Sequence, residues 1–312
     1  MTPTTLWLEF LCKVFYKFYC TNGQTYLTPD VDASKYPEIP RLTFEEFFNR
    51  HSPVSFKCSQ GRCIKCISTM PRSIAIIAGA GPGTGSAIAR RFAKAYPVVL
   101  LARSQSSLDP LVSDITRSGG SALSIPTDVS NSSSMTSTID QIKAKFGSDL
   151  TIVAAIYNVA SKFTRKPFLE QSQEDFLGSL EPSVKGAFNF AQATLPLMLN
   201  ADKGQSPPTL IFTGATAALK GSSGLSGFAM SKFGIRAMSQ SLAREFGPKG
   251  VHVSHVIIDG IINTEKTKGY LQDIPDGKID PEWIAESYWF LHTQPRTSLT
   301  HEIDLRPYAE TW

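Results

Sequence analysis

Four glycines lie within the seven residues of the segment Gly79-Ala-Gly-Pro-Gly-Thr-Gly85. A short apolar run, Ser73–Ala78, precedes them, and an alanine-rich helical pattern over residues 86–96 follows at once. Glycines let a backbone turn tightly and approach a ligand closely, and a helix that starts there directs unpaired N–H groups and its positive dipole end at an anion. This order of elements predicts a pyrophosphate site, so we expect the chain to bind a nucleotide.

The elements that would position this turn alternate between strands and helices. Because strands alternate with helices of this length, the pattern predicts a parallel sheet covered on both faces, which also fits the continuous apolar character of the strands. The strands are expected near residues 73–78, 98–101, 122–125, 150–156, 209–213 and 251–257, and the helices near residues 84–95, 108–117, 132–146, 183–199 and 228–246.

The bulk composition is that of an ordinary globular protein. The chain has 312 residues, 42% of them hydrophobic and 19% charged, with a formal net charge of +4. Such a slight charge does not favour nucleic acid as a partner. No apolar stretch reaches the roughly 18 residues of a membrane helix, and the run over residues 6–19 lacks the features of a signal peptide. We therefore expect a cytoplasmic protein that binds neither nucleic acid nor membranes.

Residues 1–69 differ from residues 70–312, because they are rich in aromatic residues and contain all five cysteines. Met70 stands just before the first strand, so this segment is either a natural extension or an artefact of how the coding sequence was assembled. Cys58, Cys63 and Cys66 have the C-x4-C-x2-C spacing found in iron–sulfur ligation, but no later cysteine supplies a fourth ligand. We expect no metal there, and a reduced, poorly ordered segment.

The glycine spacing is G-x-x-x-G-x-G, which resembles the short-chain dehydrogenase/reductase family. Four later segments agree with that family in order: Asp128-Val129, Asn158-Val-Ala-Ser161, Ser231-Lys232 and Asp259-Gly260-Ile-Ile-Asn-Thr264. The resemblance covers residues 72–305. It implies an α/β fold with a single Rossmann-type, doubly wound parallel sheet of seven strands, the last near Glu302–Leu305, after an irregular N-terminal extension.

The resemblance also implies a nicotinamide dinucleotide as cofactor. Arg103 follows the second strand, where a carboxylate would select NAD, and an arginine there can pair with a ribose 2′-phosphate. We therefore expect NADP(H); the alternative is that Arg103 is a solvated loop residue. The expected cofactor-binding residues are Gly79, Gly81, Gly83, Thr84, Gly85, Arg103, Asp128, Val129, Asn158, Ala160, Lys232, Ile262 and Thr264.

Most of the family's proton-transfer residues are missing, so the chain resembles an atypical member. The family uses a serine, a tyrosine, a lysine and an asparagine. Phe228 stands at the tyrosine position, Ala215 at the serine position and Ser183 at the asparagine position, and only Lys232 is retained. No tyrosine lies between Gly214 and Lys232, so a shift in alignment does not explain the loss.

Three hypotheses remain open. The chain is an NADP(H)-dependent oxidoreductase that reduces an iminium or activated alkene rather than a plain ketone, with Thr216, Ser183 and Tyr157 as the hydroxyls that could act beside Lys232. Alternatively it is a non-redox enzyme, or a catalytically inactive NADP-binding or interaction protein. The aromatic segment over residues 282–312 indicates either an apolar or aromatic small-molecule substrate or a packing role. The resemblance implies a homodimer or homotetramer.

Overall fold

A parallel sheet of seven strands lies at the centre of the computed structural model, which describes residues 73–160, 162–201 and 206–310. Its order is β3-β2-β1-β4-β5-β6-β7, and every neighbouring pair is parallel. The predicted single, doubly wound sheet is therefore confirmed. The expected extension over residues 1–69, with its cysteine spacing, lies outside the described residues. The strands are β1 Ser73–Ala78, β2 Val98–Ala102, β3 Ala122–Pro126, β4 Thr151–Tyr157, β5 Thr209–Thr213, β6 His252–Ile258 and β7 Glu302–Leu305.

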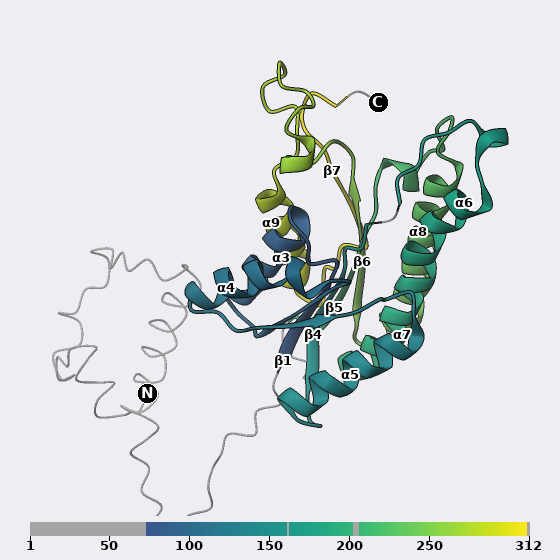
Figure 1. The fold of residues 1–312 in the computed structure, drawn as a ribbon. Coiled ribbons are helices and arrows are strands. Elements are labelled where there is room, and N and C mark those ends of the chain that lie inside the picture. The colour runs from purple at the N-terminus through teal and green to yellow at the C-terminus, as the bar shows by residue number, and fades with distance from the viewer. Residues whose placement is uncertain (1–72, 161, 202–205, 311–312) are drawn as a thin grey trace, which may run out of the picture. The chain divides into compact units, whose positions relative to one another are not determined.

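Helices cover both faces of this sheet (Figure 1). The buried side chains of α3, α4 and α9 belong to one hydrophobic core, and those of α5, α7 and α8 belong to the core on the other face. Helix α6 packs against α8. The helices are α3 Thr84–Ala93, α4 Asp109–Arg117, α5 Ser132–Phe146, α6 Gln173–Leu180, α7 Gly186–Leu199, α8 Ser226–Phe246 and α9 Pro281–His292, and the short turns are Gln105–Ser107, Phe168–Glu170, Glu181–Lys185, Thr216–Ala218 and Glu265–Thr267.

Strand β1 shows why the strands read as continuous apolar runs. Ile74 and Ile76 point into the core beneath α5, α7 and α8, whereas Ala75 and Ile77 point into the core beneath α3, α4 and α9. Successive side chains of a strand alternate between faces, so a strand covered on both sides is apolar at every position. Each buried isoleucine contributes about 1.5–3 kcal/mol to stability, which anchors the strand ends that carry the site.

The structure corrects the start of one predicted helix. The helix expected over residues 183–199 begins at Gly186, and the preceding Glu181–Lys185 is a π-helical turn that contains Ser183. A π turn places one extra residue in the helical path, and such turns occur often at functional sites. The wider turn changes the direction of the Ser183 side chain relative to a regular helix, which periodicity alone does not predict.

Two helices were missing from the sequence-based prediction. Helix α6 starts with a capping box in which Ser172 and Asp175 bond to each other's backbone N–H groups. Helix α9 starts with Asp280, whose side chain accepts from the N–H of Glu282, followed by Pro281 in the first turn. Both starts are sequence signals that would have revealed these helices. The aromatic segment over residues 282–312 therefore begins as a packed helix, with Tyr288 fully buried.

The part of the chain that the structure describes contains neither a membrane-spanning helix nor a cluster of metal-ligating side chains. Its helices are too short or too polar to cross a membrane. Among the same residues, no three His, Cys, Asp or Glu side chains come together as a metal site would require.

Candidate functional site

The glycine turn lies where the strand order reverses, between β1 and β4. A Cβ atom at Gly79, whose φ is +82°, would lie 2.3 Å from the Asn158 carbonyl oxygen, and one at Gly85 would lie 2.1 Å from the Gly79 carbonyl oxygen. Neither position accepts a side chain without displacing backbone. The Asn158 Nδ2 donates to the Gly79 carbonyl at 3.2 Å, which ties the ends of the two strands together. Ligands of open α/β sheets bind at this reversal point.

The first turn of α3 contains a buried hydroxyl that a ligand could bond. The helix begins at Thr84. Its cap residue is Gly83, which has no side chain that could bond to the N–H groups of the first turn. The Thr84 hydroxyl is buried and has no hydrogen-bond partner among the described residues. A buried polar atom without a partner is unfavourable unless a ligand satisfies it. A dinucleotide pyrophosphate fits this environment because it accepts hydrogen bonds from hydroxyl and N–H groups.

The segment after β6 lies directly over this turn. A Cβ atom at Gly83 would lie 2.8 Å from the Thr264 Cγ2, so the structure brings Thr264 and the glycine turn together. Thr264 is held by Thr267, with which it forms a reciprocal cap. Ile262 forms an isolated bridge with Ile279 and packs on the core beneath α3 and α9.

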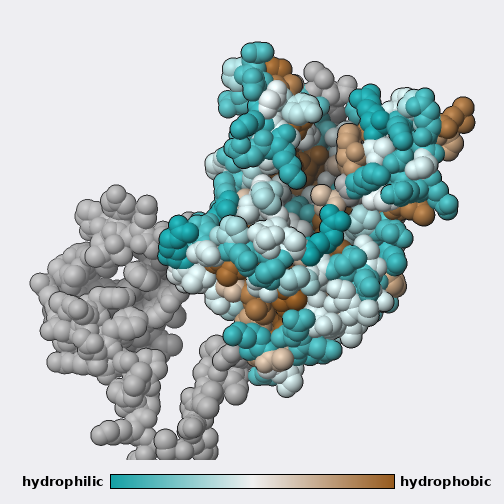
Figure 2. Space-filling view, in the orientation of Figure 1, coloured by the Kyte–Doolittle hydropathy of each residue, from teal (hydrophilic) through white to brown (hydrophobic). Residues whose placement is uncertain are grey.

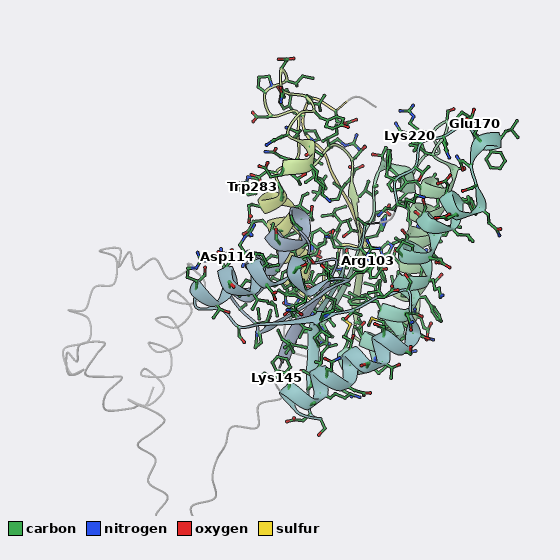
Figure 3. All side chains as sticks on the ribbon, viewed as in Figure 1. Arg103, Asp114, Lys145, Glu170, Lys220 and Trp283 are labelled. Carbon is green, nitrogen blue, oxygen red and sulfur yellow. The ribbon has the colours of Figure 1, made fainter. Side chains whose placement is uncertain are left out.

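The ends of β2 and β3 carry the remaining predicted nucleotide contacts. Arg103 directly follows β2 and is exposed (Figure 3). After β3, Asp128 accepts from the N–H of Ser130, while Val129 is buried and its carbonyl accepts from Asn189 at 2.9 Å. A hollow of about 380 Å³ opens beside them, lined by Asp128, Ser130, Asn131, Ser132, Glu181 and Lys185. Ala160, after β4, is exposed.

Lys232 is the centre of the predicted catalytic group. Its side chain is buried, and Nζ donates to the Thr213 carbonyl at 3.2 Å. Burial lowers the pKa of Lys232 to about 8, because removal from water disfavours the charged amine. The Phe228 ring lies 5.9 Å from Nζ, so an apolar ring occupies the side of the lysine where the family carries a tyrosine.

The three candidate hydroxyls differ in their environments. Tyr157 donates to the Pro182 carbonyl and packs against Phe190 and Phe212, so its hydroxyl is enclosed in the core and burial raises the pKa of Tyr157. The Ser183 hydroxyl is also fully buried, and no described group bonds to it. Thr216 is only half-buried and donates to Asp259. Thr216 is thus the most accessible of the three.

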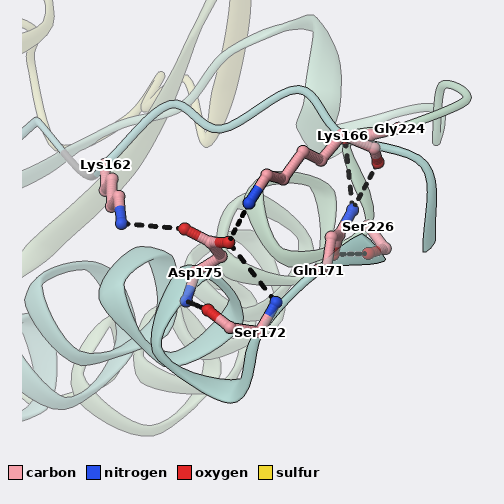
Figure 4. A network of polar contacts seen from close by, with 7 residues as sticks. All are labelled: Lys162, Lys166, Gln171, Ser172, Asp175, Gly224 and Ser226. Carbon is pink, nitrogen blue, oxygen red and sulfur yellow. Dashed lines mark hydrogen bonds and ion pairs between the residues drawn. The ribbon is translucent and has the colours of Figure 1, made fainter. Parts of the chain in front are cut away.

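A polar network holds the loop after β4 in place (Figure 4). Lys162 and Lys166 bind the two oxygens of Asp175 at 2.9 and 3.0 Å, and these bonds hold the pKa of Asp175 well below its usual range. Gln171 donates to the carbonyls of Lys166 and Gly224 and accepts from Ser226.

This anchored loop carries Phe163, whose ring meets Phe228 edge-on with a centroid distance of 5.2 Å. The rings of Phe163 and Phe228 together form an apolar wall beside Lys232. Phe163 was not among the predicted site residues, and its position depends on the loop network rather than on any local signal.

Asp259 is a second residue to which the sequence assigned no role. It directly follows β6, where the family reads proline, and its side chain bonds to Thr216 and Arg306. The acidic residue at this position is the sequence feature that could have identified Asp259 as a candidate site residue.

Comparisons with known proteins agree on the nature of the fold. A family model described as short chain dehydrogenase matches residues 73–274. An uncharacterised oxidoreductase of Staphylococcus aureus strain USA300 is 27% identical over 243 residues, which are 77% of this chain and 100% of that protein. A 3-oxoacyl-[acyl-carrier-protein] reductase of Bos taurus is 27% identical over 229 residues, which are 71% and 92% of the two chains.

Solved structures are similar as well. A short-chain dehydrogenase from Rhodopseudomonas palustris is 32% identical, with a TM-score of 0.62 over 76% of this chain and 99% of that one. A metagenomic short-chain oxidoreductase in complex with NADP has a TM-score of 0.65 at 23% identity, over 77% and 99% of the two chains. This second likeness shows the fold alone.

Proposed function

The chain belongs to the short-chain dehydrogenase family, and from that premise we propose that it is an NADP(H)-dependent oxidoreductase that reduces an iminium or an activated alkene rather than a plain ketone. Oxidoreductases of this family use nicotinamide cofactors and act on small molecules. The observation that carries the proposal is the pairing of a glycine turn built for a pyrophosphate with a buried Lys232 that faces the ring of Phe228.

The chain's own residues would hold the dinucleotide along the carboxyl edge of the sheet. The glycine turn and the free Thr84 hydroxyl would take the pyrophosphate, and Lys232 the nicotinamide ribose. Arg103, exposed at the end of β2, would pair with a 2′-phosphate, which favours NADP over NAD.

The proposed substrate class follows from what Phe228 lacks. When bound, the nicotinamide would supply a hydride to the substrate carbon. A ketone also needs a proton at its oxygen, and Phe228 has none to give. An iminium carbon already carries positive charge and needs no proton from the protein, whereas an activated alkene can take its proton from water or a side chain. Tyr157 is left out of the proposed proton donors because its hydroxyl is bonded to Pro182 inside the core.

An apolar substrate suits the surroundings of Lys232. Phe228 and Phe163 form an aromatic wall there. The face drawn in Figure 2 is hollowed between the segment after β6 and the region of α6, and brown apolar residues lie within that hollow. The cationic carbon of an iminium would also interact favourably with an aromatic face.

We also propose a homodimer or homotetramer, as is common in this family. Three large apolar side chains project from the outer helices: Phe188 on α7, and Met230 and Phe233 on α8, with exposed fractions of 51%, 54% and 42%. Exposed apolar groups of this kind on adjacent helices suit a contact between copies. Light scattering coupled to size-exclusion chromatography measures the mass directly, and a monomer would contradict the proposal.

The first experiment titrates NADPH and NADH into the full chain by calorimetry. We expect micromolar NADPH binding and weaker NADH binding. Arg103→Ala should weaken NADPH binding by about 10- to 100-fold, because a charge-assisted hydrogen bond to phosphate is lost, and should change NADH binding little. The matched control is Arg117→Ala, which removes another exposed arginine at the end of α4. Equal losses for both cofactors in Arg103→Ala would argue against NADP selection.

The second experiment distinguishes the three hypotheses. Cyclic imines and enones are mixed with NADPH while absorbance at the nicotinamide band and substrate conversion are followed together. Loss of absorbance with conversion supports the proposed oxidoreductase. Conversion at constant absorbance identifies a non-redox enzyme, and absence of both in a chain that binds NADPH identifies a binding protein.

A further inference from the structure

Three side chains that follow successive strands meet around Thr216, one of the predicted catalytic residues. Thr216 follows β5, Asp259 follows β6 and Arg306 follows β7. The Thr216 Oγ1 donates a hydrogen bond to the Asp259 Oδ1, and the Arg306 Nη2 lies 3.1 Å from the other carboxylate oxygen, Oδ2. The backbone N–H of Asp259 donates to the Leu305 carbonyl at 2.8 Å, which fixes the carboxylate between its two partners.

The direction of these bonds determines what Thr216 can offer to a substrate. A carboxylate only accepts hydrogen bonds, and a guanidinium only donates them. A threonine hydroxyl has one proton, and here that proton is directed at Asp259. The Thr216 oxygen can still accept hydrogen bonds through its lone pairs, so toward any group other than Asp259 the Thr216 hydroxyl acts as an acceptor.

The reverse arrangement is unfavourable. If Thr216 turned its proton toward a substrate, the Asp259 Oδ1 would lose its donor although the Asp259 side chain is only 10% exposed. A buried carboxylate oxygen without a donor is strongly disfavoured. Arg306 donates at 3.1 Å to the other carboxylate oxygen, Oδ2, so the Thr216 hydroxyl is the donor that Oδ1 has in this arrangement.

Thr216 also lies where a substrate would reach it. Thr213, three residues earlier, accepts from Lys232 through its carbonyl and donates to Asn158 through its hydroxyl. The Thr216 side chain is half-buried, unlike those of Ser183 and Tyr157. An accessible acceptor therefore lies three residues after the strand end that hydrogen-bonds to both Lys232 and Asn158.

We propose that Thr216 accepts a hydrogen bond from the N–H of a protonated imine, and that Asp259 and Arg306 are positioning residues that impose this polarity. This inference rests on the proposed function and narrows its substrate class. When bound, NADPH would supply a hydride to the iminium carbon and become NADP+, the C=N π pair would move to nitrogen, and the N–H bond would be retained in the amine. No proton leaves the protein, so atoms and charge balance without a tyrosine.

The test compares three probes of similar size with NADPH and the full chain. They are 2-methyl-1-pyrrolinium, its N-methyl derivative, which keeps the charge but has no N–H, and cyclopentanone. We expect kcat/KM for the N–H iminium to exceed the values for the other two by about tenfold or more, as for the loss of one hydrogen bond to a charged group. Thr216→Val should remove this preference, and Thr216→Ser should retain it. Ratios between probes do not depend on the fraction of folded enzyme.

Asp259→Asn gives a test that a merely structural role would not pass. Arg306 only donates, so the amide oxygen of the variant would face Arg306 and its NH2 would face Thr216. The Thr216 proton would then be free to point into the site, and the ratio of ketone to iminium kcat/KM should rise. NADPH binding without any preference for the N–H iminium, or an unchanged ratio in Asp259→Asn, overturns the inference alone. Absence of NADPH binding overturns the proposed function and the inference with it.

Discussion

The two halves of the candidate site are built by different means. After β1 the site consists largely of backbone, because Gly79 and Gly85 leave no room for a side chain. After β5 and β6, and along α8, it consists of side chains, and there Phe228 and Ala215 stand where the family has proton-handling groups. A backbone turn tolerates few substitutions, whereas a side chain at a fixed place can change type without disturbing the fold. Chemistry can therefore diverge in one half while the nucleotide half keeps its geometry.

The largest effect is expected from restoring the missing groups in the second half. The double variant Phe228→Tyr, Ala215→Ser adds a hydroxyl to the ring beside Lys232 and one at the serine position. A positioned general acid contributes about 10²–10⁴-fold to rate, so NADPH-dependent reduction of cyclopentanone should rise by that order. The control is Phe163→Tyr, which adds a hydroxyl to the neighbouring ring. An unchanged rate in the double variant would show that the second half of the site lacks more than these two hydroxyl groups.

A smaller effect is expected from a single methyl group in the first half. Gly85→Ala places Cβ within 2.1 Å of a backbone oxygen and should lower the free energy of unfolding by about 3 kcal/mol. Gly81→Ala is the matched control, because its Cβ would meet nothing within 4 Å. Urea denaturation of the ligand-free chains measures both. If the two variants were equally stable, the glycine turn would not be constrained by packing.

The smallest effect concerns the charge of Lys232. Its pKa is lowered to about 8 in the folded chain, against 10.5 for an ordinary lysine. Between these values the unfolded chain binds the extra proton, so the free energy of unfolding should rise with pH by about 1.4 kcal/mol per unit, and below pH 8 the contribution is constant.

The difference in unfolding free energy between the natural chain and Lys232→Met, measured from pH 7.5 to 10, isolates this slope. The exposed Lys143→Met accounts for loss of a surface charge alone. If this difference in unfolding free energy did not change with pH, the Lys232 amine would be solvated rather than buried. The second half of the site would then not depend on a desolvated lysine.

Much of the fold was readable from local patterns. The apolar runs of β1 and β5 were predicted with the bounds that the structure shows, because buried parallel strands carry an uninterrupted signal. The bounds of β7 were expected from the family resemblance instead, since this strand alternates charged and apolar residues. Helices α6 and α9 were missed because their apolar periodicity is short or aromatic, although Ser172 and Asp280 mark their starts. The π turn at Ser183 has no local signature.

By itself the sequence determined the glycine turn, the alternation of strands and helices and the loss of the tyrosine, since each is a matter of residue type or short spacing. Only the tertiary structure decided that Tyr157 faces the core, because a strand's alternation does not say which face a given residue takes. The same holds for Thr216, Asp259 and Arg306, which lie on three different loops. They meet because β5, β6 and β7 are neighbours in the sheet, and that order is a property of the assembled sheet rather than of any segment.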